Sequence, residues 1–163
     1  MDSTARFSRD VHDFLTRSGW FPGRRVDPAR WSLVLDHPER PDGFQLSDPA
    51  RAALEEFGGL QFRPGRTGVD HSPASVDFDP LTARGEEDRF DAWSKAIESR
   101  LYPLAGDLYG MYWVAMDVGG RVFLVGPSLR YVGKDITEGI ENLVLGRNPP
   151  DFFELEVEDD EEG

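Results

Sequence analysis

Two aspartates near the middle of the chain, Asp77 and Asp79, have a spacing that could support chemistry between carboxylates. They belong to the segment SVDFD (75–79), whose alternation predicts a strand with Val76 and Phe78 on one face and both aspartates on the other. Residues two apart on a strand lie about 7 Å from each other, which suits glycoside hydrolysis or a divalent cation. Every strand produces this spacing, so a solvated outer face, or an acidic face that binds a basic protein, fits it as well.

The three histidines, His12, His37 and His71, are the other candidates for acid–base or metal chemistry. Asp70 beside His71 is a pair that could start a metal or general-base site. No second histidine lies within four residues of another, so the sequence has no helical pair of metal ligands.

Motifs for the common catalytic and cofactor sites are absent from the sequence. There is no cysteine, and we find no G-x-S-x-G segment, phosphate loop or dinucleotide fingerprint. No catalytic residue, no metal and no cofactor are therefore expected. One enzyme alternative stays open, a small hydrolase whose side chains would converge in one pocket: Asp70, His71, Asp77 and Asp79.

The charge of the chain favours a protein partner. Acidic residues number 31 against 18 basic ones, for a net charge of -13. Residues 151–163 hold eight acidic residues and no basic one, and we expect them to be a disordered, solvated tail. An acidic surface repels nucleic acid and anionic membranes and attracts basic proteins, so we expect a basic protein partner, no nucleic acid and no membrane.

Length and composition indicate one globular domain in the cytoplasm. A chain of 163 residues with 39% hydrophobic and 30% charged residues can bury a sizeable core. The first residues have no apolar leader segment, and no apolar run approaches the roughly 20 residues that span a bilayer.

Apolar residues at helical spacing, together with capping and breaking residues, predict five helices. Asp48 is the expected cap of the third helix and Asp135 that of the fifth, while Gly19, Gly58 and Gly146 end helices. Phe90, Trp93, Ile97 and Leu101 form the apolar stripe of the fourth. The predicted ranges are 4–17, 28–36, 48–57, 86–101 and 135–145.

The segments between these helices predict strands. Residues 59–63 and 75–79 are expected to be extended, and Gly119 and Gly120 join a hairpin of residues 111–118 and 121–126 with Val118 opposite Arg121. Both faces of the hairpin are largely apolar, so its strands should be covered on two sides. The order of elements predicts a single α+β domain with helices packed on a mostly antiparallel, twisted sheet.

The tryptophans and the segment SGWFPGRR (18–25) raise the question of a structural or a binding corner. Trp20 and Trp31 are expected to hold the first two helices together, and Arg24 to reach a helix carboxyl end or an acidic side chain. Trp93 is expected in the core. Trp113 is either a core residue or an interface anchor.

Six segments in order resemble a known family, the third immunity family of the SUKH superfamily, over residues 5–147. They are GWFPGRRV (19–26), ALEEFGGLQF (53–62), VDFDP (76–80), LYPLAGD (101–107), MDVGGRVFLV (116–125) and ITEGIENLVLG (136–146). The resemblance implies an α+β domain over residues 1–150 and no catalytic residues, and the acidic tail is not part of the family pattern. The family-motif residues, expected to be structural, are Gly19, Trp20, Pro22, Gly23, Arg24, Phe57, Gly58, Gly59 and Leu60.

The resemblance also implies a function: members are immunity proteins, each of which neutralises a cognate bacterial polymorphic toxin by direct contact. The toxins associated with the family include nucleases and nucleic-acid deaminases. A toxin that acts on nucleic acid is basic at its substrate site, so an acidic inhibitor can block that site. A general regulatory or scaffold module is the alternative. The expected partner-binding residues are Asp77, Asp79, Glu86, Glu87 and Trp113.

Overall fold

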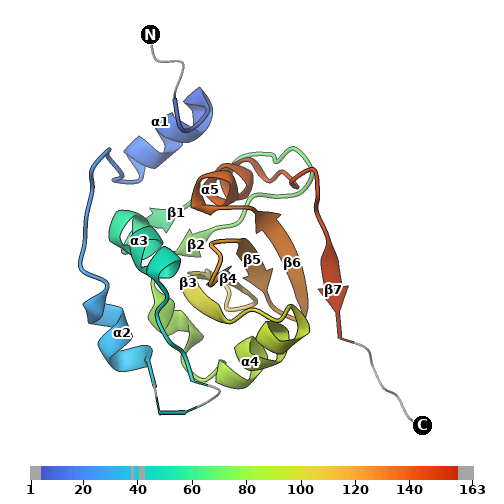
Figure 1. Ribbon diagram of the computed structural model, residues 1–163. Helices are drawn as coiled ribbons and strands as arrows, with labels where there is room; N and C mark the ends of the chain where they lie inside the picture. The colour runs from blue at the N-terminus through green and yellow to red at the C-terminus, as the bar shows by residue number, and fades with distance from the viewer. Residues whose placement is uncertain (1–4, 38, 41–42, 158–163) are drawn as a thin grey trace.

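The computed structural model describes residues 5–37, 39–40 and 43–157, which form five α-helices, one short 3₁₀ helix and one seven-stranded sheet. Every neighbouring strand pair is antiparallel, in the order β1-β2-β3-β4-β5-β6-β7 (Figure 1). The predicted α+β class with a mostly antiparallel sheet is confirmed. The helices are α1 Arg9–Arg17, α2 Ala29–Leu35, α3 Asp48–Phe57, η1 Pro80–Ala83, α4 Glu87–Ala96 and α5 Ile136–Leu145. The strands are β1 Gln61–Phe62, β2 Val76–Asp77, β3 Leu101–Asp107, β4 Trp113–Asp117, β5 Val122–Val125, β6 Ser128–Gly133 and β7 Glu154–Glu156.

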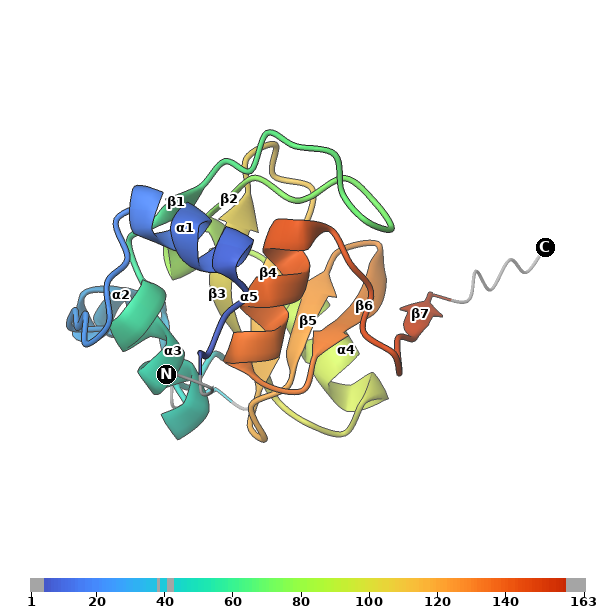
Figure 2. The same ribbon diagram turned by 90° about the horizontal axis from the view of Figure 1, so that it is seen from above.

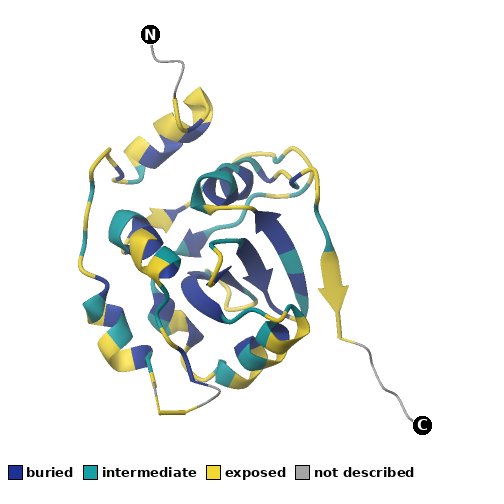
Figure 3. Cartoon of the chain, in the orientation of Figure 1, coloured by how far each residue is buried: buried dark blue, intermediate teal, exposed yellow. Residues whose placement is uncertain are grey.

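Helices cover both faces of the central strands. Gly139 of α5 approaches Val122 of β5, while Phe90 of α4 contacts Trp113 of β4. Val122 and Trp113 point to opposite faces, because Val122 lies opposite Met116, three residues along β4 from Trp113. The expectation of strands covered on two sides is therefore confirmed, and β4 and β5 are buried throughout (Figure 3). Helix α1 lies beside α5 (Figure 2).

The β4–β5 hairpin differs from the predicted register by one residue. Met116 lies opposite Val122 and Trp113 opposite Val125, so the loop has three residues, 118–120. Asp117 determines this loop: its Oδ1 accepts hydrogen bonds from the N–H groups of Gly119 and Arg121 at 3.1 and 2.8 Å. The last loop residue, Gly120, has φ +93°, which suits glycine in a three-residue hairpin. This shift of one residue changes which side chains share a face of the hairpin. Ala115 and Phe123 now lie on the same face as Trp113 and Val125.

The predicted fourth helix is too long, and strand β3, which follows it, was not predicted. Helix α4 ends at Ala96, and Leu101 begins β3 instead of ending the helical stripe. Ser94 makes the change of direction possible, because its Oγ accepts a hydrogen bond from the Leu101 N–H at 3.0 Å. Strand β3 contains proline, alanine and glycine, which are rare in strands, so its sequence LYPLAGD hides it. Strand β6 was likewise not predicted.

Two helix starts also differ from the prediction. Helix α1 begins at Arg9 and not at residue 4, although Phe7 before it is buried. Ser47 caps α3 in place of Asp48, because its Oγ accepts the hydrogen bond from the Ala50 N–H at 3.3 Å. The predicted cap Asp135 does accept from the Glu138 N–H, at 2.9 Å.

The first part of the expected disordered tail belongs to the sheet. Leu155 of β7 lies opposite Leu129 of β6, and Ser128 Oγ donates to Glu154 Oε2 at 2.7 Å. Phe153 stacks on Tyr131 with ring centroids 5.2 Å apart. Strand β7 therefore lies beyond the expected domain boundary at residue 150, among the residues expected to form the tail. Residues 158–163 lie outside the described residues.

Candidate partner-binding surface

The two aspartates singled out by the sequence lie where β2 meets its neighbours. Val76 and Phe78 are buried on the other face, as the alternation predicts. Asp77 is half-buried, and its Oδ1 forms an ion pair with Arg63 Nη2 at a distance of 2.7 Å. Asp79 is half-buried too, and its Oδ1 accepts from the Leu81 N–H at 3.0 Å at the start of η1. Each carboxylate therefore has a local structural role, which the interpretation as a solvated outer strand face does not include.

Both aspartates line one hollow of about 210 Å³, which we call the acidic hollow. Arg30 and Trp31 form part of its wall, and the Arg30 guanidinium stacks over the Trp31 ring at 4.9 Å. Within the described residues, the second oxygens of Asp77 and Asp79 make no hydrogen bond. These oxygens can accept hydrogen bonds from the ammonium or guanidinium group of a bound protein. The remaining lining residues are Gly59, Leu60, Gln61 and Phe78.

The two glutamates of the predicted site belong to a different element. Glu86 precedes α4 and pairs with Arg89 Nε at 3.1 Å, and Glu87 is the first residue of the helix. Neither lines the acidic hollow. Their charge at the amino end of α4 is favourable to that helix, because its dipole is positive there.

Trp113 is a core residue, which is one of the two alternatives that the sequence left open. Its side chain is 7% exposed, and its Nε1 donates to the Thr82 carbonyl oxygen at 3.0 Å. An interface anchor presents its ring to the partner, and the buried ring of Trp113 does not favour that expected role. The face of β4 that carries it is covered by α4.

An exposed apolar loop was missed by sequence reasoning. Leu108, Tyr109 and Met111 are 47%, 79% and 65% exposed in the turn between β3 and β4. We call residues 108–111 the apolar loop. The strand predicted for residues 111–118 includes Met111 and no strand is predicted before it, so the sequence pattern does not indicate this turn. The signal that could have revealed it is the DLYG segment (107–110), in which Asp and Gly bracket two large apolar residues.

The four residues of the hydrolase alternative do not meet in one hollow. Asp70 Oδ2 accepts from the Asn148 N–H at 2.8 Å, and His71 lines a second hollow of about 250 Å³ with Tyr112 and Arg130. Asp77 and Asp79 line the acidic hollow instead. Among the residues that the structure describes, no group of three or more metal-ligating side chains could hold an ion.

Two polar side chains that line the second hollow, Tyr112 and Arg130, are partly withdrawn from solvent. Burial is the main cause that raises the pKa of Tyr112, and nearby Asp107 adds to it, so this phenol stays protonated. The Arg130 Nε is 4.0 Å from Glu154 Oε2 and, in the described part of the chain, has no hydrogen-bond partner.

The segment SGWFPGRR forms a structural corner at the end of α3. Arg24 donates to the carbonyl oxygens of Glu56 and Gly58 at 2.8 and 2.9 Å, which confirms that it reaches a helix carboxyl end. Trp20 Nε1 donates to Glu56 Oε2 at 2.9 Å. The Trp31 ring lies so close to Gly58 that a Cβ there would be 2.4 Å from it. The other family-motif residues also belong to this corner, and Phe57 and Leu60 are buried in it.

These features define the class of protein: a single α+β domain whose described surface carries an acidic hollow and an apolar loop. No helix among the described residues has the length and apolar character to cross a membrane. The family model of the SUKH-3 immunity protein matches residues 7–146. The chain therefore belongs to the SUKH-3 immunity protein family. Searches of the curated proteins and of the solved structures each found no match.

Proposed function

We propose that this protein neutralises a cognate bacterial toxin by binding it directly and covering its active or substrate-binding surface. The observation that carries the proposal is the family match over residues 7–146, since this is a family of immunity proteins. The proposed contact is the acidic hollow, where Asp77 and Asp79 offer carboxylate oxygens to lysine or arginine side chains of the toxin.

The charge of the chain supports a toxin with a basic surface. A net charge of -13 attracts a basic protein over several ångströms of solvent and raises the rate of encounter. A toxin that acts on nucleic acid needs lysine and arginine side chains at its substrate site. An acidic protein seated there would exclude the nucleic acid by its volume and by its charge, with Glu86 and Glu87 adding to the attraction.

Growth rescue tests the function directly. Affinity capture from the native cells with mass spectrometry supplies the candidate toxin, and its toxic domain is then expressed alone in a bacterial host. We expect growth arrest, relief of the arrest on co-expression of this protein, and a stoichiometric purified complex. Many substoichiometric partners with no rescue would contradict the proposal and support a regulatory scaffold.

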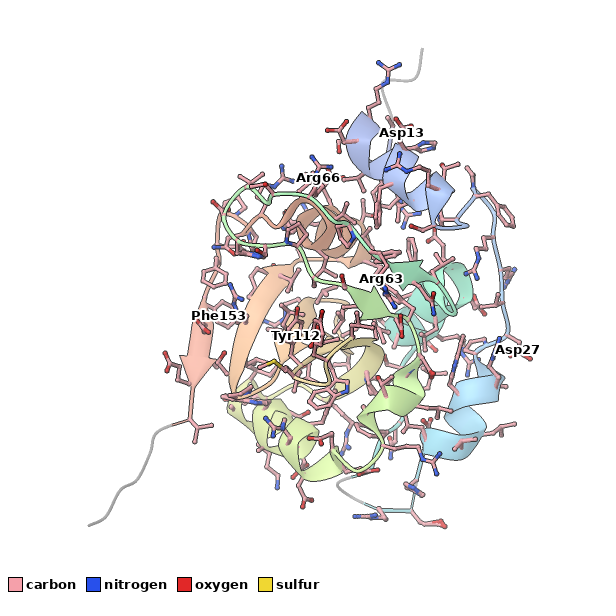
Figure 4. All side chains as sticks on the ribbon, turned by 180° about the vertical axis from the view of Figure 1, so that it is seen from behind. Asp13, Asp27, Arg63, Arg66, Tyr112 and Phe153 are labelled. Carbon is pink, nitrogen blue, oxygen red and sulfur yellow. The ribbon has the colours of Figure 1, made fainter. Side chains whose placement is uncertain are left out.

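Isosteric variants test the acidic hollow. The double variant Asp77→Asn/Asp79→Asn removes both charges but keeps acceptors for Arg63 and for the Leu81 N–H, and asparagine also caps helices well. We expect about tenfold weaker toxin binding by calorimetry, with thermal unfolding nearly unchanged. The matched control is Asp13→Asn, an exposed residue of α1 that does not line the acidic hollow (Figure 4). Equal affinity of the double variant and the control would place the contact elsewhere.

A further inference from the structure

The apolar loop concentrates exposed apolar surface in four consecutive residues. Leu108, Tyr109 and Met111 are all exposed large side chains, and Tyr109 is the most exposed of them. Single exposed apolar residues are ordinary on protein surfaces, but an apolar cluster marks a binding site. Tyrosine and methionine are also enriched at protein interfaces.

The backbone of the loop is held by its own polar groups. Asp107 Oδ2 accepts hydrogen bonds from the Tyr109 and Met111 N–H groups, each at 3.2 Å. The Gly110 N–H donates to the Asp107 carbonyl oxygen at 3.0 Å, and the Leu108 N–H donates to Ser75 at 3.0 Å. Because these hydrogen bonds fix the backbone of the loop, its main chain loses little further freedom when a partner covers it.

The loop lies next to the acidic hollow. Leu108 is bonded to Ser75, two residues before Asp77 on the same chain segment, and Asp77 lies opposite Gly106 on β3. Arg63, the ion-pair partner of Asp77, and Tyr112, the residue after the loop, are both seen in the view of Figure 4. One partner can therefore contact the loop and the carboxylate together.

We propose that the apolar loop is the central anchor of the toxin interface and inserts into an apolar pocket of the toxin that has basic groups on its rim. The inference rests on the proposed function, and it names the residues that supply most of the affinity. A second copy of this chain is a poorer occupant, because two molecules of net charge -13 repel each other. A basic toxin offers the complementary charge for Asp77 beside the pocket.

Substitution of the anchor tests the inference, with the toxin domain from the growth-rescue assay as the probe. For Tyr109→Ala we expect a Kd at least about 30-fold higher by calorimetry, as for an interface hot spot. Tyr109→Phe should keep most of the affinity, because the ring supplies the buried area. Leu33→Ala is the matched control, since Leu33 is 83% exposed on α2, and it should bind like the wild type.

Each outcome separates the inference from the proposed function. If the wild type rescues growth but Tyr109→Ala and Met111→Ala bind as tightly as Leu33→Ala, the anchor is overturned and the function stands. If the wild type neither rescues nor binds the toxin, both fail. A concentration-dependent dimer in sedimentation that Tyr109→Ala abolishes would show that a second copy occupies the loop, which also overturns the inference. Circular dichroism melts check that each variant folds.

Discussion

At the scale of single residues, the structural corner formed by SGWFPGRR (18–25) supplies hydrogen-bond partners to the carboxyl end of α3. A helix leaves its last carbonyl groups without partners, and Arg24 supplies a charged donor to two carbonyl oxygens at that end. Glu56 accepts from both Trp20 Nε1 and Arg6 Nη1, which ties the first helix to the same end. The contacts of the corner give a structural reason why glycine, tryptophan and arginine occur together.

The stability of Arg24→Met measures this role. Removal of two charge-assisted hydrogen bonds should lower the free energy of unfolding by about 2–3 kcal/mol in urea titrations. Arg25→Met is the matched control, because Arg25 is largely exposed and lies 3.7 Å from Glu55, so its loss should cost about 0.5 kcal/mol or less. Equal effects of the two substitutions would show that the carbonyl contacts contribute nothing.

At the scale of elements, β7 extends the sheet beyond the family-matched region, which ends at residue 146. Its packing depends on Phe153, which stacks on Tyr131 and contacts the Phe123 ring edge-on at 6.2 Å. The side chains of the strand itself are exposed, and Phe153 supplies an aromatic contact between this segment and the core.

The variant Phe153→Ala tests whether β7 is part of the folded unit. Loss of the aromatic contacts should lower the free energy of unfolding by about 2 kcal/mol. Val157→Ala, at a 68% exposed position, should change it by less than about 0.5 kcal/mol. Hydrogen exchange at β6 should become faster in Phe153→Ala only. A segment that behaves as a free tail would give no difference between the two variants.

At the scale of the whole molecule, net charge is the property expected to control encounter with a basic toxin. A chain ended at Val157 lacks five acidic residues of the sequence, which changes the net charge from -13 to -8. We expect slower association with the toxin and a weaker dependence on salt in stopped-flow experiments, with the dissociation rate unchanged. For the full chain, association should fall roughly tenfold from low to high salt. An association rate that is independent of salt would rule out steering.

The sequence by itself determined the features that depend on neighbours along the chain. The alternation of Val76 and Phe78 predicts their burial, Asp135 and Gly146 bound α5 as expected, and the ordered motif segments lead to the family. The composition also determines the acidic character. These properties follow from local periodicity, capping and charge, which need no knowledge of distant contacts.

Only the tertiary structure decided which faces and loops are exposed. Both faces of β4 are apolar, so periodicity could not say whether Trp113 faces a helix or a partner, and packing against α4 placed it in the core. The side chain of Asp117 determined the hairpin register, and pairing with β2 and β4 made LYPLAGD a strand. Tyr109 became exposed because that strand ends at Asp107. Contacts between distant segments decide these features, and a single sequence carries no periodic signal for them.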